Sequence, residues 1–505
     1  MRGESELSDQ EDWVCRPHCN YYKQNSSEEE RCRGYELTSV FSSMTSSRPV
    51  LSSDTPFDPD FKRSFLRDHV CSACPFLVND CDFTSLHPPE NCRPCGGLVL
   101  ISGLLREGTL SEEAVREIDL IGRNLDSRLG LTPRTAIKNL EEHYLYHVKH
   151  DELYEVNAEA FEMLNRCNGE HTVRQLNPDP AFLCVCMDED LLEFLPEARP
   201  GKLYRGRSPI PSLRYLEWLV TYRCNLSCAH CYLGESSNTD FPPDLIEPLL
   251  EQFSEMQGLR VLVSGGEPTL YPHFDVLNNL LPDYPVRAVL LSNGLTLDDR
   301  AVSKLHFHEV QISLDGMEEG HDMIRGKGAF KKALRALHAV KNAGLDLSAA
   351  TMVHRGNLGE FGRMKDLMTE LGVREWSIDY PCVAGRRVSH PDLAVGLDDA
   401  AVAMAYGFGG SYHGTSPGWT CGRHLAAVLP SGDVCRCGLY PDMRYGSVLE
   451  GLAKAWAKAE HIPIDSTLCR DCDHAESCGG GCRFRAGDAV SRDEVMCRLY
   501  GVLEK

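Results

Sequence analysis

Three cysteines in the middle of the chain have a spacing that suits an iron–sulfur cluster. Cys224, Cys228 and Cys231 are arranged as Cys-x3-Cys-x2-Cys within residues 221–232. Three thiolates can bind three irons of a [4Fe–4S] cube and leave the fourth iron without a protein ligand, whereas closed zinc and electron-transfer sites take four ligands. The spacing therefore indicates a cluster with one iron open to a small molecule. A zinc site is the alternative for three nearby cysteines.

Four segments that follow the cysteines carry residues suited to a polar ligand. Residues 262–268 read Leu-Val-Ser-Gly-Gly-Glu-Pro, a strand that runs into a glycine turn. Glycine lets backbone groups approach a ligand closely, and Glu267 offers a carboxylate to an ammonium group. The other segments are Leu-Ser-Asn-Gly at 291–294, Val-Gln-Ile-Ser-Leu-Asp-Gly at 310–316 and His-Asp-Met-Ile-Arg-Gly-Lys-Gly-Ala-Phe at 321–330.

The cysteine triplet and these segments together resemble the radical S-adenosylmethionine (SAM) superfamily, whose members chelate SAM at the open iron. The resemblance implies a role in SAM binding for Gly265, Gly266 and Glu267 at the amino group, Asn293 at the nucleoside, and Ser313 and Arg325 at the carboxylate. Ordinary turn or surface chemistry is the alternative for the last three residues.

The elements that must position these residues follow a regular order. From residue 214 to 394, strand and helix patterns alternate, which predicts parallel strands joined by crossover helices, and an apolar stripe predicts a helix over 330–343 that ends at Gly344. Six such units match the open barrel of radical SAM enzymes, so the expected fold class is α/β with a partial (β/α)6 barrel. The site residues follow strand ends, where sites of parallel barrels assemble. The expected strands are Leu216–Thr221, Val261–Ser264, Ala288–Ser292, Val310–Leu314, Ser348–Val353 and Trp376–Tyr380.

A second cysteine array lies in residues 395–505. Its pattern is Cys-x10-Gly-x4-Cys, then Cys-x2-Cys-x5-Cys-x3-Cys, then a last cysteine. This resembles in full the SPASM extension of peptide-modifying radical SAM enzymes, which holds two auxiliary clusters; a structural zinc site is the alternative. By that resemblance, one [4Fe–4S] cluster is held by Cys469, Cys472, Cys478 and Cys497, and the other by Cys421, Cys437 and Cys482 with its fourth ligand unassigned.

Two residues near Cys437 bear on the chemistry of this array. Cys435 is either the missing fourth ligand or a spare thiol, and in the second case the cluster keeps an open iron. The residue after Cys437 is Gly438, where the sulfatase-maturing branch of the family has an aspartate as its proposed proton acceptor. This difference counts against oxidation of serine or cysteine to formylglycine.

The segment before the barrel resembles a small peptide-binding module. Residues 131–196 begin with a helix-like stretch at 134–147, continue with a helix that Asn157 caps and Gly169 ends, and close with two further helical segments. This resembles the PqqD-like RiPP recognition element, a winged-helix domain that binds the leader of a ribosomal precursor peptide as an added strand. An ordinary helical domain is the alternative. Residues 197–213 read as a linker, and Cys167, Cys184 and Cys186 as small buried apolar residues.

The N-terminal region, residues 1–130, is rich in cysteine. Cys71-x2-Cys74 and Cys92-x2-Cys95 have the spacing of a zinc ribbon, with Cys81 as a possible extra ligand. A further iron–sulfur cluster or free thiols are the alternatives. Cys15, Cys19 and Cys32 form a weaker set.

Composition bounds the setting of this chemistry. The chain has 505 residues, enough for about three or four domains. A net charge of −22 argues against nucleic acid or an anionic membrane as a partner. No apolar run is long enough to span a bilayer and the N-terminal residues are polar, so we expect a cytoplasmic location. There, 23 cysteines favour metal ligation over disulfides, and an exposed cluster favours anaerobic conditions.

The features together favour a radical SAM/SPASM oxidoreductase that matures a ribosomal peptide. The resemblance implies that SAM yields a 5′-deoxyadenosyl radical, that a thioether or carbon–carbon crosslink follows, and that flavodoxin or ferredoxin supplies the electron. The sequence leaves crosslinking and epimerisation both open. The alternatives are a maturase of a folded protein such as a sulfatase, a small-molecule or tetrapyrrole enzyme, and a cluster-bearing adaptor that only binds peptides.

Overall fold

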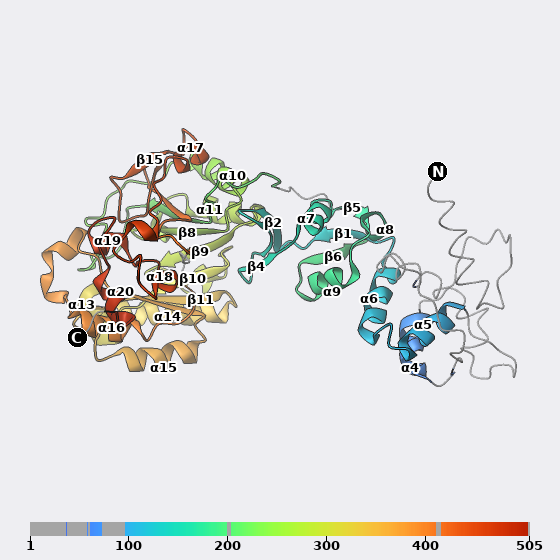
Figure 1. Cartoon of the computed structure of the whole chain (residues 1–505). Helices are drawn as coiled ribbons and strands as arrows, with labels where there is room; N and C mark the ends of the chain where they lie inside the picture. Colours follow the sequence, from blue (N-terminus) through green and yellow to red (C-terminus); the bar gives the residue numbers. More distant parts are fainter. Residues whose placement is uncertain are drawn as a thin grey trace. The chain divides into compact units, whose positions relative to one another are not determined.

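The computed structural model describes residues 37, 58, 61–72, 96–198, 204–410 and 416–502. The chain divides into two compact units (Figure 1). The first comprises residues 1–135 and 157–203, and the second comprises residues 136–156 and 204–505. The segment 131–196, expected to be one module, is therefore divided between the two units.

Six parallel strands form the centre of the second unit, and each begins within two residues of an expected strand. In spatial order they are β12 (Glu375–Asp379), β11 (Asp346–Met352), β10 (Glu309–Ser313), β9 (Arg287–Ser292), β8 (Arg260–Gly265) and β7 (Tyr215–Thr221). Helices separate them along the chain: α10 (Ile246–Glu255), α11 (Phe274–Leu280), α12 (Asp299–Val302), α13 (Glu318–Arg325), α14 (Ala329–Asn342) and α15 (Phe361–Leu371). The predicted α/β architecture is confirmed.

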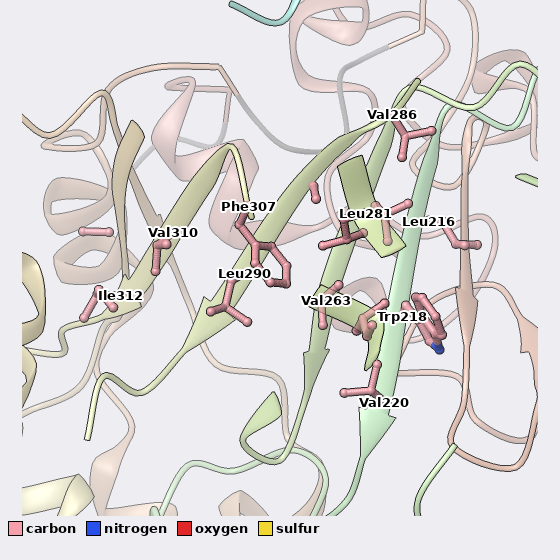
Figure 2. Close-up of a cluster of buried hydrophobic side chains, with 14 of the residues drawn as sticks. Leu216, Trp218, Val220, Val263, Leu281, Val286, Leu290, Phe307, Val310 and Ile312 are labelled. Atoms are coloured by element: carbon pink, nitrogen blue, oxygen red, sulfur yellow. The ribbon is translucent and has the colours of Figure 1, made fainter. Parts of the chain in front are cut away.

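Alternation along the strands separates a helix-facing core face from an inner face that carries both polar and apolar side chains. Leu216, Trp218 and Val220 of β7 belong with Val263 and residues of the surrounding helices to one large apolar cluster (Figure 2). Because successive residues of a strand face opposite sides, Glu217 lies on the other face of the sheet. The helix-facing core thus fixes which residues the inner face presents.

A C-terminal extension continues this sheet beyond β7. Strand β13 (Leu425–Val428) pairs parallel with β7, and β14 (Asp433–Cys435) and β15 (Arg444–Ser447) follow antiparallel. The remaining helices of the unit are short: α16 (Leu397–Met404), α17 (Leu452–Trp456), α18 (Ala475–Cys478), α19 (Arg483–Ala486) and α20 (Glu494–Leu499).

The stretch 134–147 is not helical, which corrects the sequence-based expectation. It forms β2 (Thr135–Asn139) and β3 (His143–His147), which pair with β4 (Glu152–Glu155) in a three-stranded sheet. Aromatic residues favour strand pairing in β3, and tertiary contacts override the local helical pattern. The buried Lys138 donates to the backbone oxygens of Gly258 (2.6 Å) and Pro285 (2.8 Å), so this sheet is anchored on the barrel strands.

Residues 204–213 are packed against the second unit, although the sequence suggested a linker over 197–213. Ser208 donates its backbone N–H to Asn139 (2.8 Å), and Ser212 donates both its N–H and its hydroxyl to the Glu141 carboxylate. Both serines are buried. Hydrogen bonds to the added sheet therefore hold a segment whose polar composition resembles that of a free linker.

The first unit contains helices and a small antiparallel sheet in the order β5-β1-β6. Asn157 caps α7 by accepting the N–H of Ala160, as expected, and Cys71 lies buried in a π-helix. The elements are α4 (Arg63–Leu66), the π-helix η2 (Arg67–Cys71), α5 (Gly96–Arg106), α6 (Glu112–Arg123), β1 (Arg128–Leu131), α7 (Ala158–Leu164), β5 (Asn168–Thr172), α8 (Val173–Leu176), α9 (Pro180–Asp188) and β6 (Leu192–Leu195). Over the described residues, no helix is both long and apolar enough to cross a membrane.

Candidate active site

The cysteine triplet lies in the loop that leaves the carboxyl end of β7. Cys228 is buried, Cys224 and Cys231 are half-buried, and all three are free thiols. The N–H of Cys231 donates to the oxygen of Cys228 (3.2 Å), which makes a tight turn between them. Burial raises the pKa of Cys228 to about 11, and the charge of Arg325 opposes this rise. Cys228 therefore becomes a thiolate ligand only when a metal or another cation nearby lowers its pKa.

The glycine turn after β8 brings Glu267 against this loop. Gly265 has φ +131°, and a Cβ there would stand 2.2 Å from the backbone oxygen of Thr221. A Cβ on Gly266 would stand 2.4 Å from the oxygen of Arg223. Only glycine permits such contact between the two loops. The sequence pattern thus positions Glu267 directly beneath the cysteine loop.

The Glu267 carboxylate is fully buried and well anchored. It accepts from the hydroxyls of Thr269 (2.7 Å) and Ser292 (2.9 Å), and its Oε2 accepts the N–H of Asn293 (2.9 Å). Burial raises the pKa of Glu267, and these hydrogen bonds oppose the rise. The Asn293 amide in turn donates to Asn225 (2.8 Å) in the cysteine loop. A preorganised carboxylate of this kind suits a cationic ligand group.

Arg325 belongs to a buried polar network that sequence reasoning missed. Its Nε–H donates to Asp315, and His230 lies 3.7 Å from the same carboxylate. Asp315 also accepts the N–H of Met352 and donates its own N–H to His321 (3.0 Å). Although burial acts to raise it, the pKa of Asp315 is held well below its usual range by the charge of Arg325. The pair fixes Arg325 beside the cysteine loop.

The histidines of this network are neutral near pH 7. Burial lowers the pKa of His230 and of His321 to about 4. Among the described residues, His230 Nδ1 and His321 Nε2 have no hydrogen-bond partner. Ser313 is half-buried and is the last residue of β10. Asp315 and His321 lie in segments already identified from the sequence. Their place in the network could not be predicted, because it depends on contacts among the loop after β10, the cysteine loop and α13.

A second missed carboxylate, Glu217, lies on the inner face of β7. Its Oε2 accepts the N–H of Gly438 (2.9 Å), and its Oε1 accepts the hydroxyl of Tyr232 (3.5 Å). A Cβ on Gly438 would stand 2.9 Å from both Glu217 Oε1 and the Tyr232 oxygen. The carboxylate therefore comes close to the place where an aspartate at 438 would begin. The sequence signal that could have identified Glu217 is its charge within the apolar run 216–220.

Electrostatic interactions connect several C-terminal cysteines in two sets. Burial raises the pKa of Cys478 to about 11, and the charges of Cys469 and Cys497 add to this rise. Burial likewise raises the pKa of Cys497, and the charges of Cys469 and Cys472 add to that rise. Separately, the half-buried Cys437 interacts with Cys421 and Cys482. Cys435 is fully buried in an apolar cluster with Leu219, Ala427 and Leu429.

In the described part of the chain, no group of three or more His, Cys, Asp or Glu side chains is arranged to hold one metal ion. The two cysteine groups contain only free thiols, a type of ligand that iron–sulfur clusters and zinc sites both use.

The N-terminal zinc prediction falls largely outside the described residues. Cys71 is buried at the end of the π-helix η2. Cys74, Cys81, Cys92 and Cys95, together with Cys15, Cys19 and Cys32, lie outside the described part of the chain. The zinc ribbon therefore stays a prediction from spacing.

Comparison with known proteins agrees with this geometry. Residues 218–368 match the model of the radical SAM superfamily. Mycofactocin maturase MftC of Mycobacterium ulcerans is 30% identical over 324 residues, which cover 56% of this chain and 87% of that protein. PqqA peptide cyclase of Gluconobacter oxydans is 27% identical, over 58% of this chain and 92% of its own length.

Two further likenesses broaden the comparison. AdoMet-dependent heme synthase of Nitratidesulfovibrio vulgaris is 26% identical, over 57% of this chain and 92% of its own. The crystal structure of Streptococcus suis SuiB bound to precursor peptide SuiA has the same fold, with a TM-score of 0.54, 13% identity, and coverage of 73% of this chain and 99% of that one. This chain belongs to the radical SAM superfamily. It is an enzyme of that class, for which SAM and a [4Fe–4S] cluster are the cofactors.

Proposed function

We propose that this enzyme matures a ribosomally made peptide by hydrogen abstraction, leading to a thioether or carbon–carbon crosslink. The observation that carries the proposal is the convergence of Cys224, Cys228 and Cys231 with Glu267 and Arg325 at the carboxyl ends of the barrel strands. The relatives whose names refer to maturation or peptide cyclisation, MftC and PqqA peptide cyclase, support a peptide as substrate.

The residues of the site have separable tasks in this proposal. The three thiolates would hold the cluster, which when reduced would supply the electron that cleaves bound SAM to methionine and a 5′-deoxyadenosyl radical. Glu267 binds the SAM amino group and Asn293 the nucleoside, while Ser313 and Arg325 bind the carboxylate. Asp315 uses only the Nε–H of Arg325, and a guanidinium has five N–H donors, so Arg325 can still bind a carboxylate. Burial of Glu267 and Asp315 keeps water from the anchors.

The C-terminal extension serves as a SPASM domain with two auxiliary clusters in this proposal. Cys469, Cys472, Cys478 and Cys497 hold one cluster, and Cys421, Cys437 and Cys482 hold the other. The thiol-only composition of both groups supports this assignment. A flavodoxin or ferredoxin is the proposed electron donor, because formation of the radical needs one low-potential electron.

A leader peptide would dock before the barrel, in the segment 131–196 that resembles a PqqD-like module. The order β2-β3-β4 puts β4 at an edge of its sheet, and its residues Glu152, Leu153 and Glu155 are exposed. An exposed edge can accept a peptide as an added strand. SuiB, whose fold is similar, is described as bound to a precursor peptide.

Co-expression tests the proposed function. We expect that anaerobic expression with each short reading frame beside the gene yields one peptide that has lost about two hydrogens per crosslink, seen by high-resolution mass spectrometry. The same peptide should keep its mass when co-expressed with the Cys228→Ala variant. An unchanged mass in every candidate would contradict crosslinking and direct the search to epimerisation, which deuterium incorporation from solvent detects.

The second candidate is a tetrapyrrole-modifying enzyme, favoured by the likeness to the heme synthase. A test adds an iron porphyrin to the reduced, SAM-loaded enzyme and follows the formation of heme. Turnover of the porphyrin with no modified peptide would favour this candidate. A sulfatase-type maturase is disfavoured because residue 438 is glycine where that branch has an aspartate.

A further inference from the structure

One cysteine outside the seven-cysteine pattern stands beside one of its members. Cys382 lies in the loop that follows β12, the last strand of the barrel. Its thiol interacts with the thiol of Cys482, 100 residues later in the chain. Both are free thiols and half-buried. The contact joins the end of the barrel to the group of Cys421, Cys437 and Cys482.

A buried arginine holds the two loops together. Arg485 follows Cys482 on α19, and its side chain is 9% exposed. It pairs with Asp379, at the end of β12, and donates to the oxygen of Tyr380 (3.3 Å). Its other edge donates to Asp493 (2.7 Å), whose Oδ2 also accepts the N–H of Cys482 (2.8 Å). Ion pairs and hydrogen bonds of Arg485 thus hold the Cys382 loop next to Cys482.

The other two cysteines of the group face the same place. Besides burial, the charges of Cys421 and Cys482 both raise the pKa of Cys437, and the charges of all three cysteines raise the pKa of Tyr440. Arg436 fixes the Cys421 loop by donating to its backbone oxygen (2.6 Å). Three thiols thus interact with one another, from the loop before β13, the segment after β14 and the N-cap of α19. Cys382, in the loop after β12, joins them through its contact with Cys482.

Cys435, the fourth ligand that the sequence suggested, is oriented elsewhere. Its side chain is fully buried beside Leu219 and Leu429. Its thiol donates to the backbone oxygen of Cys437 (3.5 Å). Residues i and i+2 of a regular strand share a face, but β14 ends at Cys435, so the chain turns before Cys437.

We propose that Cys382 is the fourth ligand of the auxiliary cluster held by Cys421, Cys437 and Cys482. The proposal rests on the proposed function, which supplies that cluster. With four protein ligands the cluster is closed: it can exchange electrons with the active site but offers no iron to a substrate atom. Open iron then remains only where SAM binds, among the clusters assigned to the described residues.

The experiment measures iron rather than turnover. The background is the full chain with Cys224, Cys228 and Cys231 all replaced by alanine, so that only auxiliary clusters contribute iron and paramagnetic signals. We expect about eight irons per chain in this background. Adding Cys382→Ala should lower iron to about four, or leave a cube whose spectrum shifts with cyanide, a probe for an open iron. Adding Cys435→Ala, the matched control, should change neither quantity.

A conservative variant guards against misfolding. Cys382→Ser keeps the volume of the side chain and can still donate a hydrogen bond, so a purely structural role would survive it. We expect its electron paramagnetic resonance spectrum and reduction potential to differ from the background, because oxygen replaces sulfur at one iron.

Three results would overturn the proposal. One is unchanged iron and spectra in both Cys382 variants. The second is a cyanide response in the background protein itself, which would mean that the cluster is already open. The third is a Cys382–Cys482 disulfide in the iron-loaded protein, shown by thiol counting and mass spectrometry. A background protein with no iron would overturn the auxiliary clusters themselves, which distinguishes that failure from the others.

Discussion

Replacing Cys228 with alanine is expected to abolish cleavage of SAM to 5′-deoxyadenosine. Cys228 is the most buried thiol of the triplet, and the Arg325 guanidinium next to it favours the thiolate. Because three ligands act as one unit, the loss of any one should lower the rate by at least about 1,000-fold. The measurement is 5′-deoxyadenosine formed by the reconstituted, dithionite-reduced enzyme.

A control for this variant is available in the first unit. Cys186 on α9 is also buried, and its thiol has no place in the proposed site. Cys186→Ala should lower stability through lost packing but leave SAM cleavage unchanged. Equal yields of 5′-deoxyadenosine from Cys228→Ala and Cys186→Ala would contradict the assignment of the triplet.

Replacing Arg325 with methionine is expected to destabilise the barrel and to weaken SAM binding. Asp315 is fully buried, and its charge is balanced by Arg325, whose side chain is 10% exposed. Removing one partner of a buried pair leaves an uncompensated charge, which costs about 3–5 kcal/mol of the free energy of unfolding. The pKa of Asp315 should rise in the variant, because burial remains and the cation is gone. Anaerobic denaturant titration and calorimetric titration with SAM measure the two effects.

An ion pair on the same barrel whose arginine is solvent-exposed provides the matched control. Arg363 pairs with Glu360 at 3.2 Å, and the Arg363 side chain is 65% exposed whereas that of Glu360 is 9% exposed. Without Arg363, the Glu360 carboxylate still accepts the N–H of Met317 (2.8 Å). The same change, Arg363→Met, should cost no more than about 1 kcal/mol and leave SAM affinity unchanged. If Arg325→Met were as stable as Arg363→Met, Asp315 would have to be neutral in the native enzyme, and the proposed carboxylate anchor would lose its support.

The sequence predicted the barrel closely because its strands are short apolar runs separated by amphipathic helices. Each strand from β7 to β12 begins within two residues of its expected start, since alternation and turn residues mark both ends. The prediction of a helix-like stretch at 134–147 was wrong, because β2 and β3 form strands there in spite of the local helical pattern. Contacts of Lys138 with the barrel hold these strands in place. Those contacts join residues more than 100 positions apart.

Contacts between residues far apart in the sequence also explain which features of the site could not be predicted. The cysteine triplet and Glu267 belong to local motifs, whereas the network of Asp315 with Arg325 and His230 depends on three segments meeting. Glu217 looks like one charge in an apolar strand until the sheet shows it facing Gly438. Cys382 has no motif of its own, and only the contacts of Arg485 reveal its neighbour.

Isotope transfer tests the central claim most directly. The precursor peptide identified by co-expression would be produced in fully deuterated medium and incubated with the reduced enzyme and unlabelled SAM. The account predicts deuterium in the 5′-deoxyadenosine and a modified peptide, because the radical takes hydrogen from a carbon of the substrate. 5′-Deoxyadenosine without deuterium, formed equally with and without the peptide, would contradict the claim that a peptide is the substrate of this site.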